Sequence, residues 1–177
     1  LQILNLKNSF ENYSDCLIEI IVNCQELKEV DLAYINSIIV ANNRWPIFSQ
    51  GNLAFLANTI SQNVEKLDLG ALCIMDDHVE ILLRRCNKIK AISLEATMIA
   101  DYSLMTIRKY LNQTLEELSL GYINNFSFNG FLELKSMPRL KILELSYEEE
   151  QIEKLRLHLP NLIINVVKDG SLSPNYY

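Results

Sequence analysis

The amino-acid sequence predicts an α/β solenoid, in which short parallel strands alternate with helices along a stacked array. Three observations support this fold class. One short apolar phrase recurs at similar intervals along the 177 residues. The segments between its copies carry apolar residues at helical spacing. Hydrophobic residues make up 49% of the chain, which is enough to fill a core that runs the length of such an array.

The recurring phrase has apolar residues at its first, fourth and sixth positions. Its copies are Leu1-Leu4-Leu6, Leu27-Val30-Leu32, Val64-Leu67-Leu69, Ile89-Ile92-Leu94, Leu115-Leu118-Leu120 and Leu140-Leu143-Leu145, and a weaker seventh begins near Leu162. The spacings between starts are 26, 37, 25, 26, 25 and 22 residues. Five of these six fall within the roughly 20–29 residues of a leucine-rich repeat. The sequence therefore predicts six to seven leucine-rich repeats, with starts near 1, 27, 64, 89, 115, 140 and 162 and an insertion at about 34–52.

The segments between the phrases place apolar residues at i, i+3, i+4 and i+7, which gives each predicted helix one apolar stripe. The stripes are Leu17-Ile20-Ile21-Cys24, Leu53-Leu56-Ala57-Ile60 and Val79-Leu82-Leu83-Cys86. Asp15, Asp77 and Asp101 stand just before helical segments. A carboxylate in that place can accept the free N–H groups of the first helical turn, so we expect these residues to cap their helices.

The predicted array should curve into a horseshoe. Each strand–helix unit is too small to bury its own apolar face, so neighbouring units must stack. Helices are wider than the strand spacing of about 4.8 Å, so the parallel sheet should line the concave side and the helices the convex side. We expect this array over residues 1–167 and a flexible C-terminal tail over 168–177. Because the sequence opens inside a repeat strand, we also expect residues upstream in a longer protein.

The overall charge and the cysteines limit the class of function. The net charge is −6 and the isoelectric point about 5.0, which disfavours binding to nucleic acid or to an anionic membrane surface. No apolar run approaches the roughly 18 residues of a membrane-spanning helix, and the first residues lack the basic start of a signal peptide. The four cysteines form no CxxC pair. This usage favours a reducing compartment, so we expect a cytoplasmic or nuclear location.

The residues between the apolar positions of each phrase should point out of the concave face. Six of these outward residues are acidic, namely Glu29, Asp31, Asp68, Glu95, Glu117 and Glu144. The basic ones are Lys7 and Lys66. The face should therefore carry a net charge of about −4 and favour a protein partner with a basic segment. The alternative is that this acidic face only keeps the array in solution.

Aromatic residues follow several of the predicted strands. Tyr34, Tyr122 and Tyr147 stand just past strand ends, where aromatic side chains on a rim suit contact with a partner. Packing within the repeat is the competing interpretation. Trp45 and Phe48 lie in the predicted insertion and suit either contact or internal packing.

No catalytic, metal or cofactor site is predicted. His78 and His158 fall on predicted helices, where a surface or core-edge role is expected. Cys24 and Cys86 occupy apolar-stripe positions, so a core role is expected for both. With only five glycines, no glycine-rich phosphate loop is present. We therefore expect a non-catalytic protein that needs no cofactor.

The repeats resemble the cysteine-containing leucine-rich repeats of F-box proteins. The features that carry this resemblance are the 25–26-residue period, the helix lead-ins Ile74-Met75-Asp76 and Ile99-Ala100-Asp101, and the helix endings Asn23-Cys24 and Arg85-Cys86. Residues 137–165 are similar to the last repeats of such proteins. The sequence departs from the pattern three residues after each strand, where the usual cysteine is replaced by Ser9, Ile35, Leu72, Thr97, Ile123 and Glu148.

The resemblance implies a role in ubiquitin transfer. The array would be the substrate-recognition part of an SCF-type ubiquitin ligase, and a Skp-type adaptor and a cullin would bind an F-box upstream of these residues. Other subunits would then supply the catalysis. Two alternatives remain open at this point: a leucine-rich-repeat scaffold or inhibitor unrelated to ubiquitin, and an enzyme whose catalytic domain lies upstream. The upstream sequence would separate all three.

Overall fold

The computed structural model describes residues 1–8, 14–35 and 50–167, with the side chains of 14–18 and 50–52 left aside. Its centre is one sheet of seven strands that are neighbours in the order of the chain, every adjacent pair parallel. The strands are β1 (Ile3–Asn5), β2 (Glu29–Asp31), β3 (Lys66–Asp68), β4 (Ala91–Ser93), β5 (Glu117–Ser119), β6 (Ile142–Leu145) and β7 (Ile163–Val166). The predicted α/β class with a parallel sheet is confirmed, and each strand falls on one copy of the apolar phrase.

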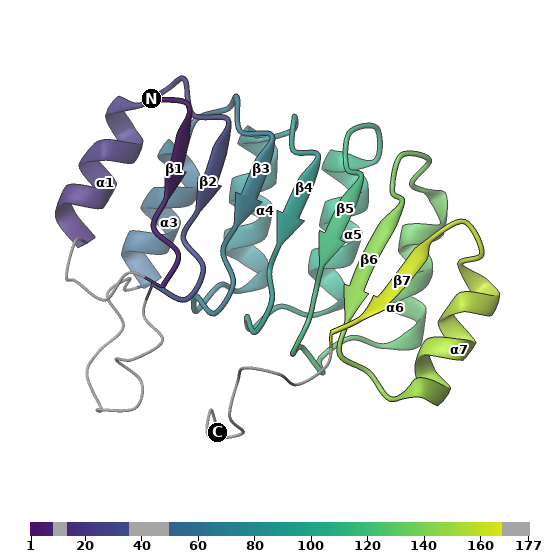
Figure 1. Cartoon of the computed structure of the whole chain (residues 1–177). Helices are drawn as coiled ribbons and strands as arrows, with labels where there is room; N and C mark the ends of the chain where they lie inside the picture. The colour runs from purple at the N-terminus through teal and green to yellow at the C-terminus, as the bar shows by residue number, and fades with distance from the viewer. Residues whose placement is uncertain (9–13, 36–49, 168–177) are drawn as a thin grey trace, which may run out of the picture.

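The helices lie on one face of this sheet and leave the other face open (Figure 1). They are α1 (Ser14–Asn23), α3 (Gln50–Thr59), α4 (Asp76–Arg85), α5 (Asp101–Leu111), α6 (Phe128–Leu132), the 3-10 helix η1 (Glu133–Ser136) and α7 (Glu149–His158). Within the described ranges, none of them is both long and apolar enough to cross a membrane. The predicted insertion falls largely outside the described residues, as do Trp45, Phe48 and the predicted tail.

The core lies between the sheet and the helices. The fourth and sixth positions of the phrase point into it, and their side chains are buried in the first six copies except for Leu6, which is half-buried. Leu6 belongs to the terminal strand region, where a described neighbour covers it on one side only. The helix stripes supply the other wall, with Leu53, Leu56, Val79, Leu82 and Cys86 among the buried residues.

The helix caps differ from the expectation. Asp76 does not serve its own helix: its Oδ1 accepts hydrogen bonds from the backbone N–H of Ala100 at 3.0 Å and of Ser103 at 3.2 Å, at the start of α5. Asp101 in turn accepts from the backbone N–H of Ser127 at 2.8 Å, just before α6. The prediction that Asp101 caps its own helix was therefore wrong, because its carboxylate reaches the next repeat.

The other two predicted caps have different outcomes. The Asp77 carboxylate accepts the backbone N–H of its neighbour His78 at 2.9 Å, within the first turn of α4. The backbone N–H of Met75 donates a hydrogen bond to Nδ1 of His78 at 3.2 Å. Asp15 lies inside α1, and its side chain is outside the described part.

A left-handed residue follows five of the strands at the same position of the phrase. These residues are Asn8, Tyr34, Ala71, Ala96 and Tyr122, with φ between 50° and 60°, and none of them is glycine. The position that follows them is buried in the described copies, by Ile35, Leu72, Thr97 and Ile123. The chain therefore makes a sharp turn after each of these strands, and the residue that follows the turn is buried in the core.

A row of alternating charges runs along the sheet where the strands begin. It consists of Lys28, Glu65, Lys90, Glu116 and Lys141, the second residue of five successive phrases, and we call it the lysine–glutamate ladder. Lys90 pairs with Glu65 and Lys141 with Glu116, each at 2.6 Å between Nζ and Oε2. The backbone N–H of each later member donates to the carbonyl of the previous one at 2.7–2.9 Å. The backbone bonds set the register of neighbouring repeats, and the exposed ion pairs add little to stability.

Candidate protein-binding face

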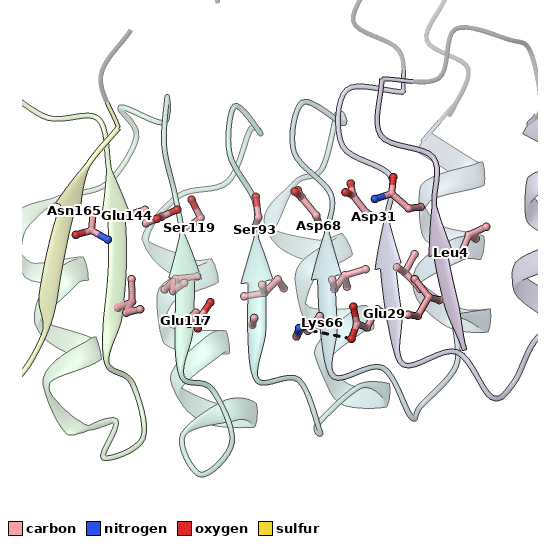
Figure 2. A pocket seen from close by; sticks show the side chains of 18 residues that line it. Leu4, Glu29, Asp31, Lys66, Asp68, Ser93, Glu117, Ser119, Glu144 and Asn165 are labelled. Carbon is pink, nitrogen blue, oxygen red and sulfur yellow. Dashed lines mark ion pairs between the residues drawn. The ribbon is translucent and has the colours of Figure 1, made fainter. Parts of the chain in front are cut away.

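The side of the sheet that none of the described helices covers forms a shallow groove across all seven strands, which we call the open face (Figure 2). Strand register arranges its side chains in rows that run across the array. One row is Ile3, Glu29, Lys66, Ala91, Glu117, Ile142 and Ile163. The next is Asn5, Asp31, Asp68, Ser93, Ser119, Glu144 and Asn165. The residues predicted to point outward therefore do so together, on one surface.

Three residues of the second row stabilise the ends of their own strands. A side-chain oxygen of Asn5, Asp31 and Asp68 each accepts the backbone N–H two residues later, at 3.1, 3.1 and 3.0 Å. This turn-forming bond is typical of Asn and Asp. The two aspartates therefore have a structural role as well as a charge on the open face.

Two of the six predicted carboxylates already have a basic partner. Lys66 Nζ lies 3.6 Å from Glu29, and Lys7 Nζ lies 3.8 Å from Asp68. Both pairs are partly exposed, so each contributes little to stability. The other four carboxylates belong to Asp31, Glu95, Glu117 and Glu144. None of these four lies within ion-pair distance of a lysine or arginine in the described ranges.

Asp31 is a half-buried carboxyl of the open face with a second carboxyl nearby. Burial raises the pKa of its carboxyl above the usual 3.8; the hydrogen bond from Ala33 opposes this rise and the neighbouring charge of Asp68 adds to it. The two aspartates are aligned on adjacent strands. A cation bound beside them would relieve this repulsion.

Glu95 lies across the small residues at the ends of the strands. Its Oε1 accepts a hydrogen bond from Ser119 Oγ at 2.6 Å, and its Oε2 accepts one from the Tyr34 hydroxyl at 3.3 Å. Tyr34 follows β2 whereas Glu95 follows β4, so this bond crosses the repeat that contains β3. A Cβ on Gly121 would meet the Glu95 side chain at 3.4 Å. The network holds the carboxylate in one place, and burial together with Glu95 raises the pKa of Tyr34.

The other two predicted rim tyrosines lie in different settings. Tyr122 is half-buried and near enough to Tyr34 to contribute to the raised pKa of the Tyr34 hydroxyl. Tyr147 packs its ring against Phe131, with centroids 5.7 Å apart, and burial raises the pKa of its hydroxyl. We therefore retain Tyr34 and Tyr122 as candidate contact residues and attribute a packing role to Tyr147.

The open face ends in an apolar patch that sequence reasoning identified only in part. Ile142 was expected to point outward, and strand pairing sets Ile163 of β7 directly beside it. The Ile163 side chain is 62% exposed. A seventh phrase that begins at Leu162 makes Ile163 its second residue, whereas the strand register places Ile163 at the third, outward position, so the predicted start concealed it. The groove is thus acidic over β2 to β6 and apolar toward β7.

The histidines and cysteines do not assemble into a reactive centre within the described ranges. His78 is buried on α4, and His158 stacks edge-on against Phe128 at 5.0 Å. Cys86 is buried, which raises the pKa of its thiol to about 12, whereas Cys24 is half-buried. No group of three metal-ligating side chains is found in the part of the chain that the structure describes.

Neither a family model nor a curated protein matches this sequence. Solved structures do match the fold. The tropomodulin C-terminal domain of Caenorhabditis elegans is 13% identical, with a TM-score of 0.59 over 84% of this chain and 92% of that chain. A chain of the yeast Rad7 and Elc1 complex is 18% identical, with a TM-score of 0.57; the match covers 89% of this chain and 42% of that chain. Actin-binding site 2 of leiomodin-1 is 15% identical, with a TM-score of 0.53 over 83% and 87%. These likenesses support a fold of the leucine-rich-repeat type.

Proposed function

We propose that this chain is a non-catalytic protein-binding module whose open face holds an extended, basic segment of a partner protein. The observation that carries the proposal is the groove across seven strands, in which the carboxylates of Asp31, Glu117 and Glu144 have no paired cation in the described ranges. Charge complementarity of this kind favours a basic partner and speeds its association. A purely solubilising face would not need the fixed position of Glu95, which accepts hydrogen bonds from Ser119 and Tyr34.

The dimensions of the open face suit a short peptide. Six strand spacings of about 4.8 Å span roughly 29 Å, and an extended peptide advances about 3.3 Å per residue. About nine residues could therefore lie along the face. In this proposal the array curves as a horseshoe with the sheet inside, since the helices need more width than the strands. The basic residues of the peptide lie over Asp31, Glu117 and Glu144, and an aliphatic residue lies over Ile142 and Ile163.

We further propose that the full-length protein is the substrate receptor of an SCF-type ubiquitin ligase in the cytoplasm or nucleus. The support is the similarity of the repeat lead-ins and of residues 137–165 to those of F-box proteins. The fold shared with a chain of the Rad7 and Elc1 complex is compatible with this role. In this proposal a Skp-type adaptor and a cullin bind an upstream F-box, and the array positions the substrate. A repeat scaffold without a link to ubiquitin is the competing proposal.

Reversing two carboxylates of the open face tests the binding role. Glu117→Lys with Glu144→Lys changes side chains that accept no described hydrogen bond, whereas Asp68 also supports a turn. The probe is a labelled nine-residue peptide of alternating lysine and valine, followed by fluorescence anisotropy. We expect the double variant to bind about tenfold more weakly at low salt, with a smaller difference at high salt, because exposed charge contacts are modest and screened.

The control is Glu19→Lys with Glu26→Lys, which makes the same change of charge at two exposed positions outside the open face. This control should retain most of the affinity. An equal loss in the control would mean that the peptide responds only to net charge, and the open face would then not be the binding site.

Co-purification tests the proposed place in a ligase. The full-length protein should bring down a Skp-type adaptor and a cullin from cells, whereas residues 1–177 alone should not. Adaptor binding by residues 1–177 would contradict this division of roles. Absence of both proteins from the full-length sample would favour the scaffold.

A further inference from the structure

A second hollow lies on the helical side of the molecule, between the C-terminal ends of α3 and α4. It is lined by Asn58, Gln62, Ile81, Arg84, Arg85, Asn87 and Lys88. Ile81 is half-buried and forms its floor, while the other side chains are exposed. Three lining residues are cations, and among the described residues no carboxylate lines it. We call this hollow the basic groove.

One of the three cations is already neutralised. Arg84 donates from its Nη2 to Glu80 at 2.9 Å and from its Nε to the Tyr110 hydroxyl at 3.2 Å. Glu80 also accepts a hydrogen bond from Tyr102 at 2.7 Å. This network ties α4 to α5 and accounts for Arg84 without any ligand.

The other two cations, Arg85 and Lys88, have no acidic partner. Arg85 Nε donates to the backbone carbonyl of Ile60 at 2.7 Å, and Lys88 Nζ donates to the side-chain oxygen of Asn63 at 2.9 Å. Neither cation lies within ion-pair distance of a carboxylate in the described part of the chain. Lys88 is near enough to Glu65 to contribute to lowering the pKa of that carboxyl, but no ion pair neutralises either cation at the basic groove in the described ranges.

The helix dipole does not fully account for these charges. Basic residues often interact with the free carbonyls at a helix C-terminus. At the end of α3, however, neutral donors already bind two of those carbonyls. The Leu56 carbonyl accepts the backbone N–H of Ile60 at 2.9 Å, and the Thr59 carbonyl accepts Nε2 of Gln25 at 3.3 Å. The charge of the two groove cations therefore remains available to an external anion.

We propose that the basic groove binds an acidic segment of a second partner protein, whose Asp or Glu carboxylates pair with Arg85 and Lys88. Guanidinium and ammonium groups form charge-assisted hydrogen bonds with carboxylates. The side-chain amides of Asn58, Gln62 and Asn87 add neutral donors around them. The groove is open to solvent, which suits side chains of a flexible segment better than an enclosed small molecule.

The net charge of −6 does not prevent this binding. Exposed charges more than about 8 Å apart are largely screened at physiological ionic strength, so the adjacent cations outweigh the distant carboxylates of the open face. The basic groove is lined by residues at the ends of α3 and α4, and these helices lie on the side of the sheet opposite the open face (Figure 1). One molecule could therefore hold a basic partner and an acidic partner at the same time.

Amide chemical-shift mapping of the whole chain with a hexaglutamate peptide tests the proposal. We expect concentration-dependent shifts over residues 58–62 and 84–88. Lys88→Gln should weaken the affinity about two- to fivefold, as expected for one exposed charge contact, and Lys88→Glu should abolish the shifts. Lys135→Gln and Lys135→Glu are the matched controls, because Lys135 is an exposed lysine with no ion pair in the described ranges. Both controls should bind like the wild type.

Three results would overturn the proposal: shifts scattered over every exposed lysine, an equal loss with the Lys135 variants, or saturation of the groove by inorganic phosphate while hexaglutamate leaves it unshifted. A hexalysine arm separates this test from that of the open face, since it should shift residues of the open face and leave the basic groove unchanged. Failure in one arm therefore does not depend on the other.

Discussion

Leu94 is a fully buried side chain at the sixth position of the fourth phrase. Leu94→Ala should lower the free energy of unfolding by about 2–5 kcal/mol, because it removes buried methyl groups and leaves a cavity that the packed repeats fill only partly. Urea denaturation measures the change. Met98→Ala, four residues later at a 58% exposed side chain, is the control and should stay within about 0.5 kcal/mol of the wild type. Equal losses would contradict the placement of the core.

The pKa of Asp31 should lie above its usual value and that of Glu65 below its own. Burial and Asp68 raise the pKa of Asp31 above 3.8, whereas the hydrogen bond and charge of Lys90 lower the pKa of Glu65 below 4.5. Carboxyl-carbon NMR measures both midpoints. Asp68→Asn keeps the acceptor for its turn and removes the charge, so it should lower the pKa of Asp31. An unchanged Asp31 midpoint in that variant would contradict the coupling between the strands.

The two shifts act on stability in opposite directions. Because the pKa of Asp31 is raised in the folded state, its ionisation reduces stability as the pH rises through that pKa, and acidification restores it. The pKa of Glu65 is lowered, so its contribution is present above its unfolded pKa and is lost as the pH falls through the folded one. Lowering the pH therefore reduces the repulsion between carboxylates on the open face and weakens the ion pairs of the lysine–glutamate ladder.

Sequence periodicity predicted the buried and outward residues well because the apolar phrase states which side of a strand each residue occupies. It could not predict the bond between Tyr34 and Glu95, since that bond joins residues 61 positions apart across an intervening repeat. The packing of Tyr147 against Phe131 was inaccessible for the same reason: it depends on where the short helix α6 lies. The local apolar pattern determines which side of the sheet a side chain faces, whereas the residue that it contacts depends on how the repeats stack.

At the scale of the element, the start of α6 depends on a residue without a side chain. A Cβ on Gly130 would overlap the Asp101 carboxylate that binds Ser127. Gly130→Ala should therefore cost about 1–3 kcal/mol through this overlap. In an Asp101→Ala background the same substitution should be neutral or stabilising, because alanine favours a helix over glycine by about 1 kcal/mol.

A double-mutant cycle followed by chemical denaturation tests this coupling. The four proteins are the wild type, each single variant and the double variant. A cost of Gly130→Ala that is the same in both backgrounds would show that the strain arises elsewhere in α6. The helix positions were predictable from their apolar stripes, but the reach of Asp76 and Asp101 into the following repeat was not. A side chain that caps the helix of the next repeat can be identified only once the positions of the two helices are known.

At the scale of the whole molecule, each strand of the described part pairs only with its neighbours in the sequence. The helices follow the same rule, with α3 packed on α4 and α4 on α5. Such an array has no closed core, so its cohesion depends on each successive junction. The repeat period in the sequence predicted this architecture. The apolar end of the open face could be identified only once the position of β7 was known, and the basic groove only once the ends of α3 and α4 were placed.

Positive and negative residues alternate along the lysine–glutamate ladder. The charges that meet after a deletion therefore depend on whether an odd or an even number of repeats is lost. Loss of one repeat between Glu65 and Glu116 would bring two carboxylates together on adjacent strands, where like charges repel. Loss of two adjacent repeats would instead set Lys28 beside Glu116 and preserve an attractive pair. Along this edge, the stretch of chain that can be duplicated or deleted without creating repulsion is a pair of repeats.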